Sequence, residues 1–169
     1  MMSDLRDDAL WDGPSKEPDE ELPTRGRAVA SKTERVETRG RARALQALYA
    51  ADLRDLTKLE RIASHVFDDL AVDAGERAFA SKLVATVAMH GAALDAALSE
   101  VTANWRLERL GAIERSVLRL AAAEMHRGDA PIKVVIHEAV HLAERFGTAR
   151  SARFVNGVLD AYARRLGKL

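Results

Sequence analysis

The chain has 169 residues, a length that fits one domain, and it contains no cysteine. The lack of cysteine excludes disulfides, thiol nucleophiles and cysteine-ligated zinc or iron–sulfur sites. The formal net charge is zero, but residues 1–24 hold two bases and eight acids (net −6), whereas residues 25–43 hold seven bases and two acids (net +5).

Residues 1–30 are predicted to form a disordered acidic tail. This stretch contains three of the four prolines and most of its charges are acidic, without hydrophobic periodicity. Its one large aromatic, Trp11, is more typical of an unstructured segment than of a docking anchor. We therefore expect a tail followed by one folded domain, residues 31–169. The chain has no apolar run long enough to span a membrane and no apolar signal core, so we expect a cytoplasmic protein.

The remainder predicts an all-α fold of about seven helices, because alanine is abundant and period-2 alternation is absent. Ser31–Glu34 has the pattern of a capping box that would open the first helix, and Thr148 is expected to cap the last. Gly91 is predicted to interrupt a long helical segment. Trp105 and Leu107 are expected to pack in a connection. The expected helices cover residues 31–53, 57–70, 74–89, 94–101, 109–126, 132–146 and 148–166.

The start of the first helix combines an apolar stripe with a cluster of arginines. On a helical wheel, Arg39, Arg43 and Gln46 share one exposed stripe, and Arg41 lies near the edge of the apolar face. Arginines near a helix N-terminus oppose the macrodipole, so a purely structural sequence would favour acids there. Guanidinium groups bind phosphates and base edges, so the segment predicts an anionic partner, with a solvated helix start as the alternative. The expected buried face comprises Leu45, Leu48, Tyr49 and Leu53.

A second motif, from His137 to His141, matches the HExxH pattern of zinc hydrolases. On a helix it would place two imidazoles on one face with Glu138 beside them. However, Glu144 stands where a metzincin has glycine, and no third histidine follows. A solvated helix face is the favoured interpretation, and a zinc hydrolase is the remote alternative. Adventitious metal binding by the two histidines stays open. No nucleophile-elbow, P-loop or dinucleotide pattern is present, so no catalytic residue or cofactor is predicted.

Four blocks stand out by their order and spacing. They are RARALQALY ending at Tyr49, IERSVLRL at residues 113–120, VIHEAVHLA at residues 135–143 and RFVNGVLD at residues 153–160. Together they resemble the NusB family of transcription antitermination factors. The resemblance covers about residues 35–166, and its last block is the most specific.

This resemblance implies an all-helical fold of two small packed bundles. It implies a non-enzymatic factor that binds single-stranded boxA RNA of nascent rRNA transcripts with ribosomal protein NusE and so supports rRNA transcription. Other Nus factors and RNA polymerase are then indirect partners, and no membrane is involved. A helical protein-interaction module without RNA binding is the alternative, and homodimer formation stays open. By resemblance, the RNA-binding residues are Arg39, Arg41, Arg43, Gln46, Tyr49, Glu114, Arg119, Arg150, Arg153 and Phe154.

Overall fold

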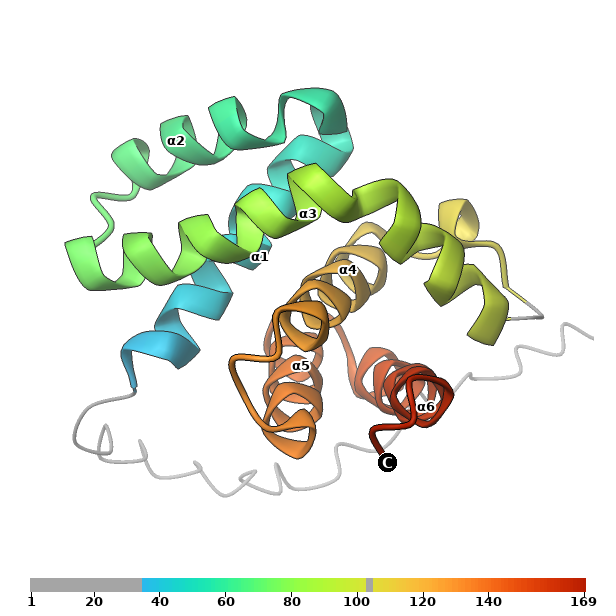
Figure 1. Cartoon of the computed structure of the whole chain (residues 1–169). Helices are drawn as coiled ribbons and strands as arrows, with labels where there is room; N and C mark the ends of the chain where they lie inside the picture. The colour runs from blue at the N-terminus through green and yellow to red at the C-terminus, as the bar shows by residue number, and fades with distance from the viewer. Residues whose placement is uncertain (1–34, 103–104) are drawn as a thin grey trace, which may run out of the picture. The chain divides into compact units, whose positions relative to one another are not determined.

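The computed structural model describes residues 35–102 and 105–169 (Figure 1). The predicted acidic tail with Trp11 and the predicted capping box Ser31–Glu34 lie outside the described residues. The described part contains six α-helices, two 3-10 helices and no strand, which confirms the all-α class. None of these helices is both long and apolar enough to cross a membrane. The elements are α1 (Val36–Arg54), η1 (Leu56–Lys58), α2 (Leu59–Asp69), α3 (Ala74–Val101), η2 (Leu107–Arg109), α4 (Ala112–Arg127), α5 (Ile132–Phe146) and α6 (Ala149–Arg165).

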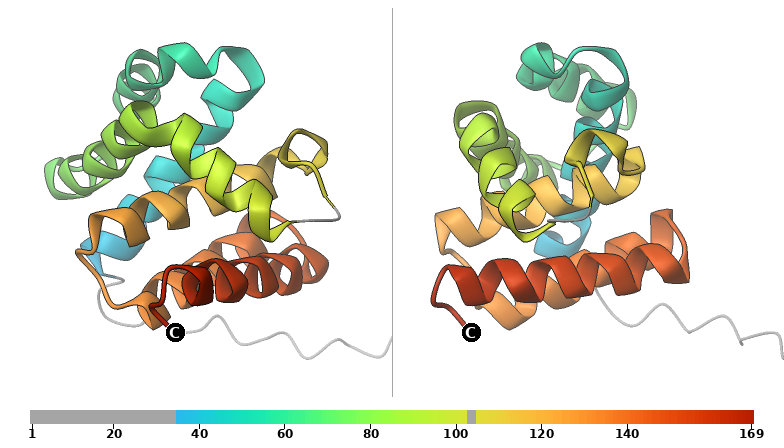
Figure 2. Two further views of the ribbon diagram at one scale, coloured as in Figure 1. Left: turned by 45° about the vertical axis from the view of Figure 1, so that its right-hand side comes forward. Right: turned by 90° about the vertical axis from the view of Figure 1, so that its right-hand side faces the viewer.

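The helices form two groups joined through α4. Helices α1, α2 and α3 pack on one another, and so do α4, α5 and α6. Helix α4 also packs against α1 and α3, and Figure 2 shows it lying between these helices and the pair α5 and α6. Every residue from Ser116 to Met125 is buried, as expected for a helix that is covered on all sides.

Helix α3 runs unbroken from Ala74 to Val101, so the predicted interruption at Gly91 is wrong. A glycine inside a helix costs about 1 kcal/mol relative to alanine. That cost is smaller than the gain from burying Leu83, Val87, Leu94 and Leu98 along one continuous helix. The two helices expected on either side of Gly91 are therefore one, and the described residues contain six α-helices instead of seven.

Helix α1 turns a different face inward from the one predicted. Leu45 and Leu48 are buried as expected, but Tyr49 and Leu53 are 38% and 61% exposed. A Cβ atom added to Gly40 would lie 2.7 Å from Cδ1 of Phe79 on α3, so the two helices approach closely here. Small residues on this side let α3 pack tightly, and the outer residues of α1 are left in solvent. The small buried residues of α1 are Gly40, Ala42, Ala44, Ala47 and Ala51.

Local signals mark the end of α4 and the starts of α5 and α6, and the predicted cap at Thr148 is confirmed. Gly128 ends α4 in the left-handed conformation at a φ of 73°, and Pro131 directly precedes α5. Thr148 caps α6 in a reciprocal capping box, in which the Thr148 side chain accepts from the backbone N–H of Ser151 and the Ser151 side chain accepts from that of Thr148. These local signals fix where α6 begins and hence where its first side chains lie.

Candidate nucleic-acid interface

Arg39 and Arg43 lie on one face of α1 and share a carboxylate of α3. Nε of Arg39 donates to Oε1 of Glu76 at 2.6 Å, and Nε of Arg43 donates to Oε2 at 3.3 Å. Arg43 also donates through Nη1 to Gln46. Burial alone would raise the pKa of Glu76, but the hydrogen bonds and charges of the two arginines outweigh it and hold this pKa below its ordinary value. The three charged side chains carry a net charge of +1, and each arginine remains about one-third exposed.

Arg41 points to the opposite side of α1 and is buried, with 5% exposure. Its Nε and Nη2 donate to Glu124 of α4 at 2.5 to 3.1 Å, and its Nη1 lies 3.7 Å from Oε2 of Glu138 of α5. Burial would lower the pKa of Arg41, but its bonds to Glu124 and the surrounding carboxylates outweigh this and raise the pKa. From the sequence we expected Arg41 to contact RNA, but in the structure its guanidinium is enclosed by protein. It lies at the contact between α1 and α4.

Arg119, also expected at the RNA surface, is likewise buried at 8% exposure. Its Nε and Nη2 each donate to Asp95 of α3 at 2.9 Å, and its Nη1 donates to Asp52 of α1 at 2.7 Å. The guanidinium thus joins α4 to both neighbouring helices. Neither Arg119 nor Arg41 presents a charge at the surface in this structure.

A pocket of about 380 Å³ brings together several of the sequence-predicted residues; we call it the Phe154 pocket. Glu114 reaches it from the first turn of α4 and accepts a hydrogen bond from the Ser151 hydroxyl. The half-buried ring of Phe154 meets the indole of Trp105 nearly perpendicularly, with centroids 6.4 Å apart and planes at 77°. The lining residues are Trp105, Arg109, Leu110, Gly111, Glu114, Thr148, Arg150, Ser151 and Phe154.

Four arginines, two in the segment after Trp105 and two in the first turns of α6, differ from those of α1 and α4 in having no side-chain partner among the described residues; Arg109 and Arg150 line the Phe154 pocket and Arg106 lines a neighbouring one. Arg106, Arg109, Arg150 and Arg153 are all exposed, and none makes a side-chain hydrogen bond or ion pair with another described residue. We call these four residues the unpaired arginines. Arg150 and Arg153 were expected from the sequence, whereas Arg106 and Arg109 were missed. Glu108 and Glu114 line the same pockets but form no ion pair with these arginines, so their guanidinium groups remain available to an anion.

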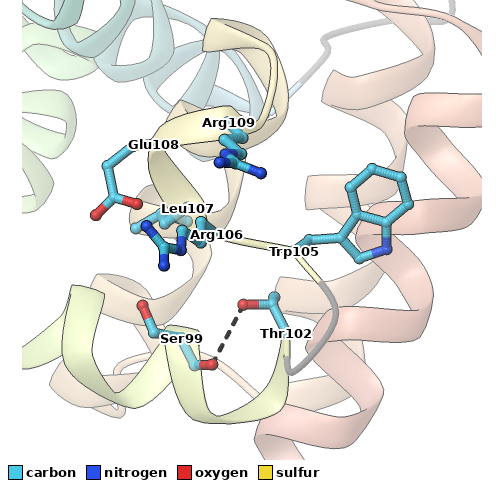
Figure 3. Close-up of a pocket in the computed structure, with 7 residues that line it drawn as sticks. All are labelled: Ser99, Thr102, Trp105, Arg106, Leu107, Glu108 and Arg109. Carbon is cyan, nitrogen blue, oxygen red and sulfur yellow. Dashed lines mark hydrogen bonds between the residues drawn. The ribbon is translucent and has the colours of Figure 1, made fainter.

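Trp105 was expected to be packed, but its side chain is 60% exposed. It lines both the Phe154 pocket and a second pocket of about 810 Å³. Figure 3 shows the indole set apart from the side chains of Ser99 and Thr102 across this second pocket. The sequence signal for an exposed Trp105 is the segment from Trp105 to Arg109, in which one aromatic residue and two arginines surround a single apolar residue, Leu107.

The segment that follows Trp105 is held in place by one arginine of α4. Nη1 of Arg115 donates to the backbone oxygens of Leu107, Glu108 and Leu110 at 3.3, 3.4 and 2.7 Å. Its Nε and Nη2 donate to the Asp52 carboxylate at 3.0 and 2.5 Å. Burial would raise the pKa of Asp52, but its hydrogen bonds from Arg115 and Arg119 outweigh this and lower it.

The HExxH segment does not assemble a zincin arrangement among the described residues. His137 and His141 are exposed on α5, whereas Glu138 is turned toward α1 and accepts a hydrogen bond from the Thr38 hydroxyl at 3.1 Å. The described residues contain no group of three or more histidine, aspartate or glutamate side chains placed to hold a metal ion. Glu138 therefore connects α5 to α1 and is not placed as a base beside two metal ligands.

Comparison with known proteins gives a consistent result. The NusB family model matches residues 38–164. The transcription antitermination protein NusB of Anaeromyxobacter dehalogenans is 42% identical over 136 residues, covering 75% of this chain and 89% of the relative. The protein of the same name from Bacillus subtilis is 41% identical over 121 residues, covering 71% and 88%.

Solved structures agree with the sequence relatives. The crystal structure of T. maritima NusB has a TM-score of 0.70 and 33% identity, covering 76% of this chain and 90% of that one. A NusB chain crystallised with NusE and dsRNA has a TM-score of 0.72 and 27% identity, covering 79% and 99%. The matched stretch contains all six described α-helices apart from the first two residues of α1 and the last residue of α6. On these grounds, the chain belongs to the NusB family.

Proposed function

We propose that this chain is an RNA-binding transcription antitermination factor, which binds single-stranded boxA-type RNA in nascent rRNA transcripts together with ribosomal protein NusE. Its relatives carry the name transcription antitermination protein, and a neighbouring fold was solved with NusE and RNA. The proposed action is non-enzymatic and cytoplasmic, and other Nus factors and RNA polymerase are reached indirectly.

The observation that carries the RNA part is the set of unpaired arginines beside the Phe154 pocket. Free guanidinium groups form paired hydrogen bonds to phosphates without first breaking a protein ion pair. Inside the pocket, the carboxylate of Glu114 can accept a hydrogen bond from a base amino group, and the ring of Phe154 offers apolar contact. Hydrogen-bond donors for phosphate, a hydrogen-bond acceptor for a base and an aromatic ring therefore lie within one site.

Residues of α1 extend this surface in the proposal. Arg39 and Arg43 supply a net positive charge, and the exposed ring of Tyr49 offers a stacking face or a phenol hydrogen bond, with Gln46 beside it. Arg41 and Arg119 are assigned a positioning role, because their buried ion pairs hold α1, α3 and α4 together. With about four phosphate contacts, the logarithm of the RNA association constant should fall with the logarithm of the salt concentration with a slope near −3. The affinity for RNA is therefore modest until NusE adds contact area.

The test is a fluorescence-anisotropy titration of labelled boxA-type RNA, with and without NusE, at several salt concentrations. The double variant Arg150→Ala/Arg153→Ala should weaken binding and reduce the salt slope by about 2. The matched control is Arg164→Ala, which removes an exposed arginine of the same helix that already pairs with Asp160 at 2.9 Å. A wild-type protein that binds NusE but no RNA would favour the protein-interaction alternative.

A further inference from the structure

We infer that Trp105 is a stacking platform for one unpaired base of the bound RNA strand, with Arg109 and Arg106 on the adjoining phosphates. The inference rests on the proposed function and adds a contact that the sequence blocks did not contain. It extends the RNA surface from the Phe154 pocket over residues 105–109.

The first support is that Trp105 is exposed and yet well fixed. Tryptophan is highly buried on average, and 60% exposure leaves much of the indole uncovered. Its backbone N–H donates to the carbonyl of Thr102 at 2.7 Å, and its ring meets Phe154. Two residues later, Leu107 is buried and its carbonyl is bound by Arg115. An aromatic ring held in this way loses little conformational entropy on binding.

The second support is the perpendicular contact with Phe154. An edge-to-face pair uses one face of one ring and the edge of the other, so it leaves much ring surface for a further partner. A nucleobase is a flat ring of matching size, and base–aromatic stacking is tolerant of sequence because every base has a π-face. The 380 Å³ of the Phe154 pocket is within the range of pockets that accept small ligands.

The third support is the chemistry around the indole, which favours RNA over an apolar protein surface. Its neighbours in the larger pocket are Ser99 and Thr102 at the C-terminal end of α3 and the residues Arg106, Leu107, Glu108 and Arg109, so two cations stand against one carboxylate. Cations beside an exposed aromatic are the arrangement that single-stranded nucleic acid requires, with phosphates on the arginines and a base on the ring. Bases inside a duplex are already stacked on their neighbours, so only an unpaired base can reach this ring.

The test uses the full chain carrying Trp11→Phe, which leaves Trp105 as the one tryptophan. Its fluorescence is followed during titration with a boxA-type single strand and with the same sequence as a duplex. The single strand should quench the indole, and the duplex should not. Trp105→Ala should bind the single strand about 5- to 150-fold more weakly, and Trp105→Phe should recover most of that loss.

The control is Met89→Ala, which truncates an equally accessible apolar side chain (77% exposed) on α3 and should bind as wild type does. In titrations with NusE, the double variant Trp11→Phe/Trp105→Phe provides the background signal. Unchanged affinity of Trp105→Ala, with wild-type RNA binding intact, would overturn the inference and leave the proposed function standing. Quenching by NusE without RNA would also overturn it, by making Trp105 a protein contact. Absence of RNA binding by the wild type would overturn the proposed function itself.

Discussion

Arg41 and Glu124 form a buried ion pair across the contact between α1 and α4, with N–O distances of 2.5 to 3.1 Å. Their side chains are only 6% and 4% exposed. Transfer of two charges from water is costly, and their mutual attraction compensates only while both partners are present. The placement of α1 therefore depends on Arg41. From the sequence, Arg41 was expected to bind RNA together with Arg39 and Arg43.

Replacement of Arg41 by alanine is expected to destabilise the protein by about 3–5 kcal/mol, because Glu124 would be left buried without a partner. Urea unfolding measures this loss. The double variant Arg41→Met/Glu124→Leu should recover most of it, since two apolar side chains avoid the buried charges. The control Arg164→Ala breaks an exposed pair and should cost less than about 1 kcal/mol. If folded Arg41→Ala protein lost tenfold or more in RNA affinity, Arg41 would be a contact residue after all.

Two glycines in helices should respond in opposite directions to replacement by alanine. At Gly40 the new Cβ would lie 2.7 Å from Cδ1 and 3.1 Å from Cβ of Phe79. Overpacking of this kind costs about 1–3 kcal/mol, more than the roughly 1 kcal/mol gained in helix propensity, so Gly40→Ala should lower the melting temperature. At Gly91 no atom apart from the adjoining backbone of α3 and the two neighbouring residues lies within 4 Å of the new Cβ, so Gly91→Ala should raise the melting temperature. A stabilising Gly40→Ala would show that α1 and α3 are not closely packed.

The lowered pKa values of Glu76 and Asp52 predict a loss of stability in acid. Because the folded-state pKa lies below the unfolded value of about 4, each carboxylate stabilises the fold above pH 4. That contribution is lost as the pH falls through the folded-state pKa. Glu76→Gln should therefore be less stable than wild type at pH 7 but lose less stability between pH 7 and pH 3, as measured by urea unfolding.

For the pH experiment, Glu60→Gln on the exposed face of α2 is the matched control and should keep the wild-type profile. Equal acid losses in wild type and Glu76→Gln would mean that the two arginines do not stabilise the ionised carboxylate.

Deletion of residues 1–30 should tighten RNA binding. The stretch of residues 1–24 carries a net charge of −6 and precedes a stretch with a net charge of +5, so the tail can compete with RNA for the arginines. The gain should be largest at low salt and shrink as screening increases. Anisotropy titrations of the two proteins at matched salt measure it, and a tail variant with its acids replaced by serine should behave like the deletion. Equal affinities at low salt would refute this competition.

Structural features that depend on residues close together in the chain were predicted well from the sequence. The end of α4 at Arg127, one residue past the predicted end, and the cap of α6 at Thr148 depend on local backbone chemistry. Gly91 was misjudged because a weak local preference was outweighed by packing with distant helices. The burial of Arg41 was not predicted because its partner Glu124 lies 83 positions away, and a helical wheel contains no information about such a contact.

The residues of the candidate site also fall into those that were predicted from the sequence and those that were missed. Glu114 and Phe154 lie in the short sequence blocks, Arg150 was inferred from the resemblance, and the structure brings all three to one pocket. Trp105 and Arg109 were missed because they lie between two helices, where no periodicity reports whether a side chain is covered. Their exposure is set by Leu107 and by the bonds of Arg115 to the backbone of this segment.

The Asp52 carboxylate sits one turn beyond Tyr49 on α1 and receives both Arg115 and Arg119. Through Arg115, the same carboxylate is bonded to the segment that carries Trp105. The carboxylate thereby links the C-terminal part of α1, which carries Tyr49, to the segment that carries Trp105. A substitution at Asp52 would therefore disturb the support of both segments at once, although the Asp52 side chain itself is only 7% exposed.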